Sequence, residues 1–129
     1  HSGFAALRSE CTMTVGQRIR LRAPTARLAA DVARLDALWS EGLARFGGPY
    51  LAGQDFTAVD AFFAPVAFRV RTYGLALSSP AQGYAERLLS LPAMREWEAA
   101  ALAEPWREAA HEAEARSLGE ILADLRAPV

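Results

Sequence analysis

Apolar residues recur every three or four positions along most of this chain, which is the period of an amphipathic helix. The longest such stretch predicts a helix from about residue 24 to residue 46, with Pro24 in its first turn and Gly47-Gly48 at its end. Its apolar stripe consists of Leu28, Val32, Leu35, Trp39, Leu43 and Phe46.

The segment from residue 57 to about residue 74 predicts a second long helix, which Gly74 ends. Its apolar residues follow helical spacing closely: Val59, Phe62, Phe63, Val66, Val70 and Tyr73. We expect this to be the central helix, with Phe62 and Phe63 almost fully buried and facing the preceding helix. Pro65 lies inside the segment and predicts a kink.

The rest of the chain predicts shorter elements. These are the end of a helix up to about residue 11, a helix opened by Ser79 and Pro80, one from Pro92 to just before Pro105, a charged one over 104–116, and a marginal tail helix after it. Residues 17–22 alternate polar and apolar side chains, which is the period of a strand. Because no second strand is evident and a lone strand is not stable, we interpret them as an extended connection with exposed arginines. The expected fold class is all-α, with five to seven helices.

Composition limits the function classes. At 129 residues, the length fits one all-helical domain spanning 1–129. Acidic and basic residues nearly balance, all basic residues are arginine, and no apolar run approaches the roughly 20 residues of a membrane helix, so we expect neither a nucleic-acid nor a membrane partner. Cys11 is the one cysteine, which excludes an internal disulfide and favours the cytoplasm. Two histidines and one cysteine give no metal-site spacing.

Thr57 and Asp60 are spaced as a capping box at the start of the central helix. In such a box the carboxylate accepts from the Thr57 amide, and the threonine hydroxyl accepts from an amide one turn on. Replacing either residue by alanine is expected to cost about 1–2 kcal/mol, non-additively because both serve one box. We interpret the pair as a folding device and not as catalytic residues.

Three motifs in order resemble a known family. The sequence Tyr50-Leu51-Ala52-Gly53 precedes the capping box, and Leu91-Pro92 opens a segment that continues through Trp97 to Glu104-Pro105-Trp106. The chain begins His1-Ser2-Gly3-Phe4, followed by Leu7-Arg8. Together these motifs, over residues 1 to about 116, resemble the C-terminal helical domain of bacterial glutathione S-transferases.

The resemblance implies a helical bundle around the central helix, truncated so that it starts within its first helix. Family members bind glutathione mainly on a preceding thioredoxin-like domain that also carries the catalytic residue, so no catalytic residue is expected in this chain. The helical domain supplies the apolar pocket for a small hydrophobic electrophile in glutathione conjugation, a detoxification chemistry, or in other thiol-dependent reactions. The resemblance also implies a homodimer in the cytoplasm.

Five residues are candidates for the substrate or glutathione pocket. His1 matches a histidine that lies near the glutathione thiol in some bacterial members. Phe4 is a candidate for the apolar wall, and Arg8 for attracting an anionic substrate or a glutathione carboxylate. Arg69 and Tyr73 lie four residues apart on the central helix, so they share a face. Trp39, Trp97 and Trp106 are interpreted as packing residues, and Cys11 as a small buried residue.

One alternative stays open at this point. The same fold serves as a non-catalytic protein-interaction domain in translation factors, so the chain is either the substrate-binding part of an enzyme or an interaction module. A nucleic-acid binder built on Arg18, Arg20 and Arg22 would need a clustered basic face, which the scattered acidic residues do not favour.

Overall fold

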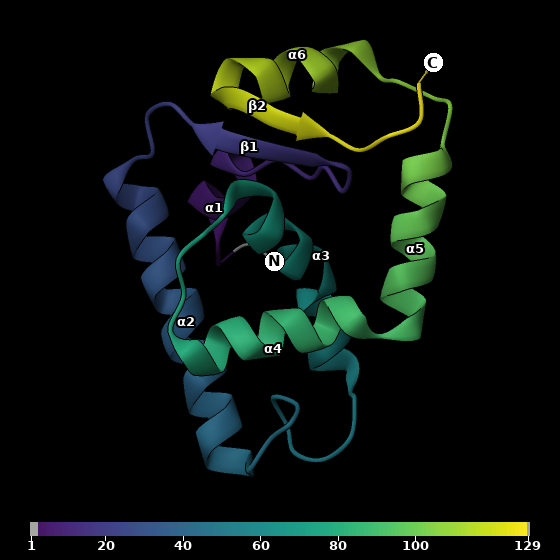
Figure 1. The fold of residues 1–129 in the computed structure, drawn as a ribbon. Helices are drawn as coiled ribbons and strands as arrows, with labels where there is room; N and C mark the ends of the chain where they lie inside the picture. The colour runs from purple at the N-terminus through teal and green to yellow at the C-terminus, as the bar shows by residue number, and fades with distance from the viewer. Residues whose placement is uncertain (1–2, 129) are drawn as a thin grey trace.

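The structure is a computed structural model that describes residues 3–128. The elements in this range are α1 (Ala5–Glu10), β1 (Gln17–Leu21), α2 (Ala26–Phe46), α3 (Ala58–Tyr73), α4 (Ser79–Ser90), α5 (Pro92–Ala103), α6 (Ala109–Leu118) and β2 (Gly119–Asp124). Figure 1 shows α2 and α5 on opposite sides of the molecule, with α4 crossing between them and α3 running through the middle. The two strands and α6 cover one end. The mostly helical class predicted from the sequence is confirmed.

The long helix α2 begins and ends close to its predicted limits. Its N-cap is Thr25, whose hydroxyl oxygen accepts from the Leu28 amide at 3.1 Å, so Pro24 precedes the helix instead of opening it. Glu10 at the end of α1 accepts from the Thr25 hydroxyl at 2.5 Å. Gly47 ends the helix at φ 80°, a left-handed conformation that glycine adopts without strain.

The central helix α3 begins with the predicted capping box. The Thr57 amide donates to Oδ2 of Asp60 at 2.8 Å. The carboxylate does more than cap the helix, because it is fully buried and its Oδ1 accepts from the Leu51 amide at 3.2 Å and from the Tyr84 hydroxyl at 2.7 Å. Asp60 therefore joins three parts of the chain: the loop before α3, α3 itself and α4.

The predicted buried face of α3 is confirmed at Val70 and Tyr73, which are buried, but it is wrong in the first half of the helix. Phe62 is 78% exposed and Val59 is exposed, while Phe63 and Val66 are only partly buried. The side chains that α3 buries are Asp60, Ala67, Phe68, Val70, Thr72 and Tyr73. Polar residues belong to this face because each finds a partner there: the Thr72 hydroxyl donates to the Thr14 carbonyl at 2.6 Å. The helix is central, but Val59 and Phe62 near its start are exposed, and Phe63 and Val66 are only partly buried against the core.

Residues 17–22 and the chain end are also corrected. β1 pairs antiparallel with β2, from Gln17 opposite Asp124 to Leu21 opposite Gly119, so neither the extended connection nor the tail helix is present. The pairing is close at Gly119, where a Cβ atom would lie 2.4 Å from the Arg20 carbonyl oxygen. The sequence therefore needs glycine here for the approach of two backbones.

A polar cluster fixes β2 against the helices. Arg126 pairs with Asp124 at 2.5 Å and, more closely still, with Glu112 of α6. Asp124 also accepts from the buried Gln17 amide group at 3.1 Å. The hydrogen bonds from Arg126 hold the pKa of both carboxyl groups below their usual values. The last strand is thus held by charge as well as by its backbone ladder.

The C-terminal helix and one of the tryptophans differ from expectation. α6 begins at Ala109, five residues later than predicted, because the segment around Pro105 is not helical. Trp39 is fully buried as predicted, but Trp106 is 78% exposed. Trp97 is partly exposed and packs edge-on against Phe68, with ring centroids 5.0 Å apart.

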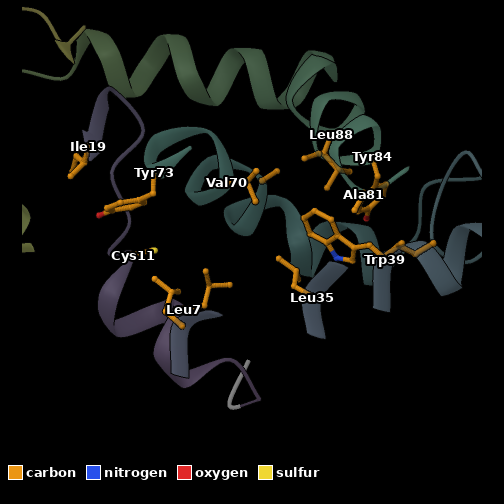
Figure 2. Packing of buried hydrophobic residues seen from close by; sticks show 14 of the residues in the cluster. Leu7, Cys11, Ile19, Leu35, Trp39, Val70, Tyr73, Ala81, Tyr84 and Leu88 are labelled. Carbon is orange, nitrogen blue, oxygen red and sulfur yellow. The ribbon is translucent and has the colours of Figure 1, made fainter. Parts of the chain in front are cut away.

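The core extends along α3. Figure 2 shows Leu7, Cys11 and Tyr73 near one end of the buried cluster, Trp39, Tyr84 and Leu88 near the other, and Val70 between them. The end that holds Leu7 and Cys11 is built from α1, so this short helix is fixed by the core beneath it.

Candidate functional site

Helix α1 is too short to be stable by itself, and contacts with other parts of the chain hold it in place. An isolated helix of 6 residues is not stable in water. Its Leu7 side chain is fully buried, and the Leu7 amide donates to Oδ2 of Asp31 on α2 at 3.1 Å. Arg69 of α3 donates from Nε to the Cys11 carbonyl, which lies at the C-terminal end of α1, at 2.7 Å. These bonds fix α1 against α2 and α3.

A cavity of about 450 Å³ lies between α1 and α3. Its walls are mostly apolar, and its lining residues are Phe4, Leu7, Arg8, Phe62, Phe63, Pro65, Val66 and Arg69. The volume is within the range of pockets that hold small molecules. We call this cavity the α1–α3 pocket. It contains three of the five candidates from the sequence: Phe4, Arg8 and Arg69.

Aromatic contacts shape the wall of the α1–α3 pocket. The Phe4 and Phe63 rings meet edge to face with centroids 6.4 Å apart, and Phe63 meets the buried Trp39 in the same way at 5.5 Å. The Phe4 ring also contacts the Arg34 guanidinium, whose central carbon lies 4.1 Å from the ring centroid. Such ring pairs stabilise the positions of the walls beyond simple burial.

Two guanidinium groups supply the polar part of the pocket. Arg8 is exposed, and Arg69 is partly buried. Burial lowers the pKa of Arg69, and the positive charge of Arg8 lowers it further, so the two groups are electrostatically coupled. Arg69 stays cationic at neutral pH because an arginine pKa lies far above it. Within residues 3–128 neither forms an ion pair with a carboxylate.

Tyr73 does not line the α1–α3 pocket. It is buried in the core, and its hydroxyl donates to the Thr12 carbonyl at 2.9 Å. Burial raises the pKa of Tyr73, so the phenol stays protonated at neutral pH. Its location next to Arg69 on one helix face did not bring it into the same cavity, because α3 turns this residue toward β1.

The sequence also singled out His1, Thr57, Asp60 and Cys11. His1 lies outside the described residues. Thr57 and Asp60 lie at the opposite end of α3 from Arg69 and serve the fold. Cys11 is buried as expected, and burial raises the pKa of its thiol to about 12, so the nucleophilic thiolate is not populated at neutral pH.

Sequence reasoning missed the pocket residues of α3. Phe62, Phe63 and Val66 were assigned to the core, but they line the α1–α3 pocket. The signal was present in the unusual number of apolar side chains on this helix, which exceeds what a single buried stripe requires. An apolar residue does not reveal by itself whether it packs on the core or faces a ligand.

Two features are absent from the described part of the chain. No group of three or more His, Cys, Asp or Glu residues within 3–128 is placed to hold a metal ion. Among the same residues, no helix is both long and apolar enough to cross a membrane.

Comparison with known proteins shows the family. The sequence model of the glutathione S-transferase C-terminal domain matches residues 22–110. This is more than half of the chain, and the chain therefore belongs to the glutathione S-transferase C-terminal domain family. No curated protein and no solved structure gives a significant match. The matched range includes Arg69 on α3 but begins after Phe4 and Arg8.

Proposed function

We propose that this chain is the electrophile-binding helical domain of a glutathione S-transferase. One observation supports the proposal above the others: an apolar cavity of about 450 Å³ lies between α1 and α3, and it contains Phe4, Arg8 and Arg69. These three residues were candidates for the pocket from the sequence, and they come from two segments about 60 residues apart.

Glutathione itself fits this pocket poorly. The tripeptide is polar along its whole length, whereas the walls of the α1–α3 pocket are mainly Phe, Leu, Pro and Val side chains. Buried polar groups need hydrogen-bond partners, and only Arg8 and Arg69 offer side-chain donors here. Glutathione is therefore assigned to a thioredoxin-like domain, in agreement with the family resemblance, and the pocket to its co-substrate.

The chemistry follows from this division. The glutathione thiolate attacks an electrophilic carbon of the co-substrate, a carbon–sulfur bond forms, and with a chloronitrobenzene the ring loses chloride. The helical domain holds the electrophile close to the sulfur and excludes water with its apolar walls. Positioning of this kind lowers the barrier because it converts a two-body encounter into a step within one complex. The reacting groups come from glutathione and the substrate.

The proposal is tested with two proteins. We expect that the 129-residue chain neither binds millimolar glutathione in calorimetric titration nor conjugates it to a chloronitrobenzene in an absorbance assay. The same chain joined to its thioredoxin-like domain should do at least one of these. Tight glutathione binding by the 129-residue chain alone would show that this proposal assigns the glutathione site to the wrong domain.

A pocket-filling variant tests the assignment of the electrophile. In the two-domain protein, Val66→Phe should raise the KM for the chloronitrobenzene while glutathione binding stays unchanged. The matched control is Ala61→Phe, which adds a ring at an exposed position of the same helix that lines neither the α1–α3 pocket nor the cavity between α2 and α3. Equal effects of the two variants on the KM would contradict the pocket assignment.

A second surface supports assembly. Leu38, Phe46 and Val59 are exposed and line a cavity of about 340 Å³ between the end of α2 and the start of α3. Exposed apolar surface of this kind is typical of protein contacts, and we assign it to a homodimer. Sedimentation equilibrium should show a dimer that Leu38→Glu dissociates.

The same surface also supports the alternative function, a non-catalytic protein-interaction domain. The two functions differ in what the two-domain protein does. An interaction module would lack conjugation activity with every electrophile tested and would keep its apolar surface for another protein. Measurable activity that Val66→Phe reduces excludes this alternative.

A further inference from the structure

The α1–α3 pocket pairs apolar walls with two positive charges that have no acidic partner in the described part of the chain. Arg8 comes from α1 and Arg69 from α3, and both line the cavity. Surface arginines are ordinarily surrounded by water or by carboxylates. Here two of them share the boundary of a cavity lined mainly by Phe, Leu, Pro and Val. The combination calls for a ligand that is apolar at one end and negatively charged at the other.

The nearby carboxylates are already engaged. Glu10 of α1 accepts from the Thr25 hydroxyl and from the Thr25 amide, so it caps α2. Asp31 accepts from the Leu7 amide at 3.1 Å and pairs with Arg34 at 3.6 Å. Both acids close to α1 are thus bound to the scaffold. The fold leaves the positive charge of the pocket uncompensated by its own acids.

The geometry of Arg69 leaves its terminal nitrogens available. Its Nε bonds to the Cys11 carbonyl at 2.7 Å, and within residues 3–128 Nη1 and Nη2 have no hydrogen-bond partner. Anchoring at Nε fixes the plane of the guanidinium group. A planar guanidinium held in this way presents two parallel donors to a carboxylate, the geometry of a bidentate pair. Arg8 supplies a second charge, and its exposed side chain makes no hydrogen bond in the described range.

We infer that the electrophile held in the α1–α3 pocket is an apolar, ring-sized molecule that carries a carboxylate, and that Arg69 and Arg8 bind this carboxylate. The inference rests on the proposed function and narrows its substrate class. It assigns the two arginines to the co-substrate and not to glutathione, because the surface next to them is apolar. Partial burial of Arg69 strengthens its attraction for an anion, since water screens the charge less there.

The test compares two probes of the same shape. These are 2-naphthoate, which has a carboxylate, and 2-naphthamide, which is neutral. Each is titrated into the 129-residue chain and followed by NMR chemical shifts. Hydrogen bonds to charged groups lead us to expect roughly tenfold tighter binding of the carboxylate. Arg8→Gln should lower this preference to about threefold, because Arg69 alone then faces the carboxylate, and should leave amide binding unchanged.

Control variants separate charge from folding. Arg8 is exposed and forms no side-chain hydrogen bond in the described part, so Arg8→Gln should fold normally. Arg8→Lys retains the charge and should retain the preference. Arg95→Gln on α5 removes an exposed arginine far from the cavity and should leave both affinities unchanged. Arg69→Gln is informative only if its circular dichroism matches the parent, because it also loses the bond to Cys11.

Several results would overturn the inference. Equal binding of the two probes would show that the arginines do not recognise the carboxylate, while the proposed function would stand. If neither probe binds, the α1–α3 pocket is not a ligand site. Competition by glutathione that Arg8→Gln abolishes would assign the arginines to glutathione. A preserved carboxylate preference in a two-domain protein without conjugation activity would support the inference and contradict the proposed function.

Discussion

Because the carboxylate of Asp60 is buried, we predict that replacing Asp60 destabilises the protein much more than replacing Thr57, the other residue of the capping box. The alanine variant removes the acceptor for the Leu51 amide, the Thr57 amide and the Tyr84 hydroxyl. Two of these donors lie on buried residues, and each unsatisfied buried donor costs about 1–3 kcal/mol. Adding about 1 kcal/mol for the lost cap gives an expected cost of roughly 3–7 kcal/mol for Asp60→Ala. The spacing of the box alone led to about 1–2 kcal/mol for this change.

Thr57→Ala is the matched comparison. It removes a partly exposed hydroxyl and should cost only about 1 kcal/mol. The double variant should be less destabilised than the sum of the single variants, because both residues serve one helix start. Urea denaturation followed by far-ultraviolet circular dichroism measures all three free energies of unfolding. The reasoning fails if Asp60→Ala costs no more than Thr57→Ala.

A second cycle isolates the link to α4. Tyr84→Phe removes one donor to Asp60 and should cost about 1–2 kcal/mol. Asp60→Asn keeps the size of the side chain but not its charge. If the hydroxyl and the carboxylate interact as the 2.7 Å distance indicates, the two changes should be coupled by about 1 kcal/mol or more. Strict additivity would contradict this contact.

Phe62→Ser should change the free energy of unfolding by less than about 0.5 kcal/mol because the ring is exposed, whereas Phe68→Ala should cost about 3–5 kcal/mol, both measured by urea denaturation. Gly119→Ala should destabilise the β1–β2 pairing, because its Cβ meets a backbone carbonyl at 2.4 Å, and hydrogen exchange of the strand amides should accelerate. The carboxyl groups of Glu112 and Asp124 have lowered pKa values in the folded state, so the stability they provide is present above about pH 4.5 and is lost as the pH falls further, which acid titration of the denaturation midpoint should show.

Part of the fold could be predicted from local pattern. The apolar period of α2 and the glycine at its end predict this helix, and both signals depend only on neighbouring residues. The same holds for the start of α3, where Thr57 and Asp60 lie three residues apart. The additional partners of Asp60 could not be predicted, because Leu51 and Tyr84 reach it through tertiary packing.

The sheet could not be predicted for a related reason. Residues 17–22 show the strand period, but their partner segment GEILAD also fits a short helix, and its apolar pattern does not decide between the two. Pairing between segments so far apart is set by tertiary contacts, here the close approach at Gly119 and the charges around Arg126. Local sequence carries little information about either.

The candidate site was predicted in part. Phe4, Arg8 and Arg69 were expected at a pocket and line one, but the pattern on α3 was taken to describe a single buried face. Val70 and Tyr73 of the predicted stripe are buried, whereas Phe62 and Phe63 border the pocket, and Asp60 and Thr72 are buried with hydrogen-bond partners. Hydrophobic periodicity alone does not show which apolar residues of a helix pack on the core and which line a cavity.

The pairing of β1 with β2 also sets an order for biosynthesis. Gln17 leaves the ribosome about a hundred residues before its partner Asp124. Until then the backbone donors and acceptors of β1 have no strand to bond with, and an open strand edge is a surface on which other nascent chains can pair. The helices between the strands can already fold during this interval. Synthesis of β2 therefore completes this pairing and removes a site of aggregation.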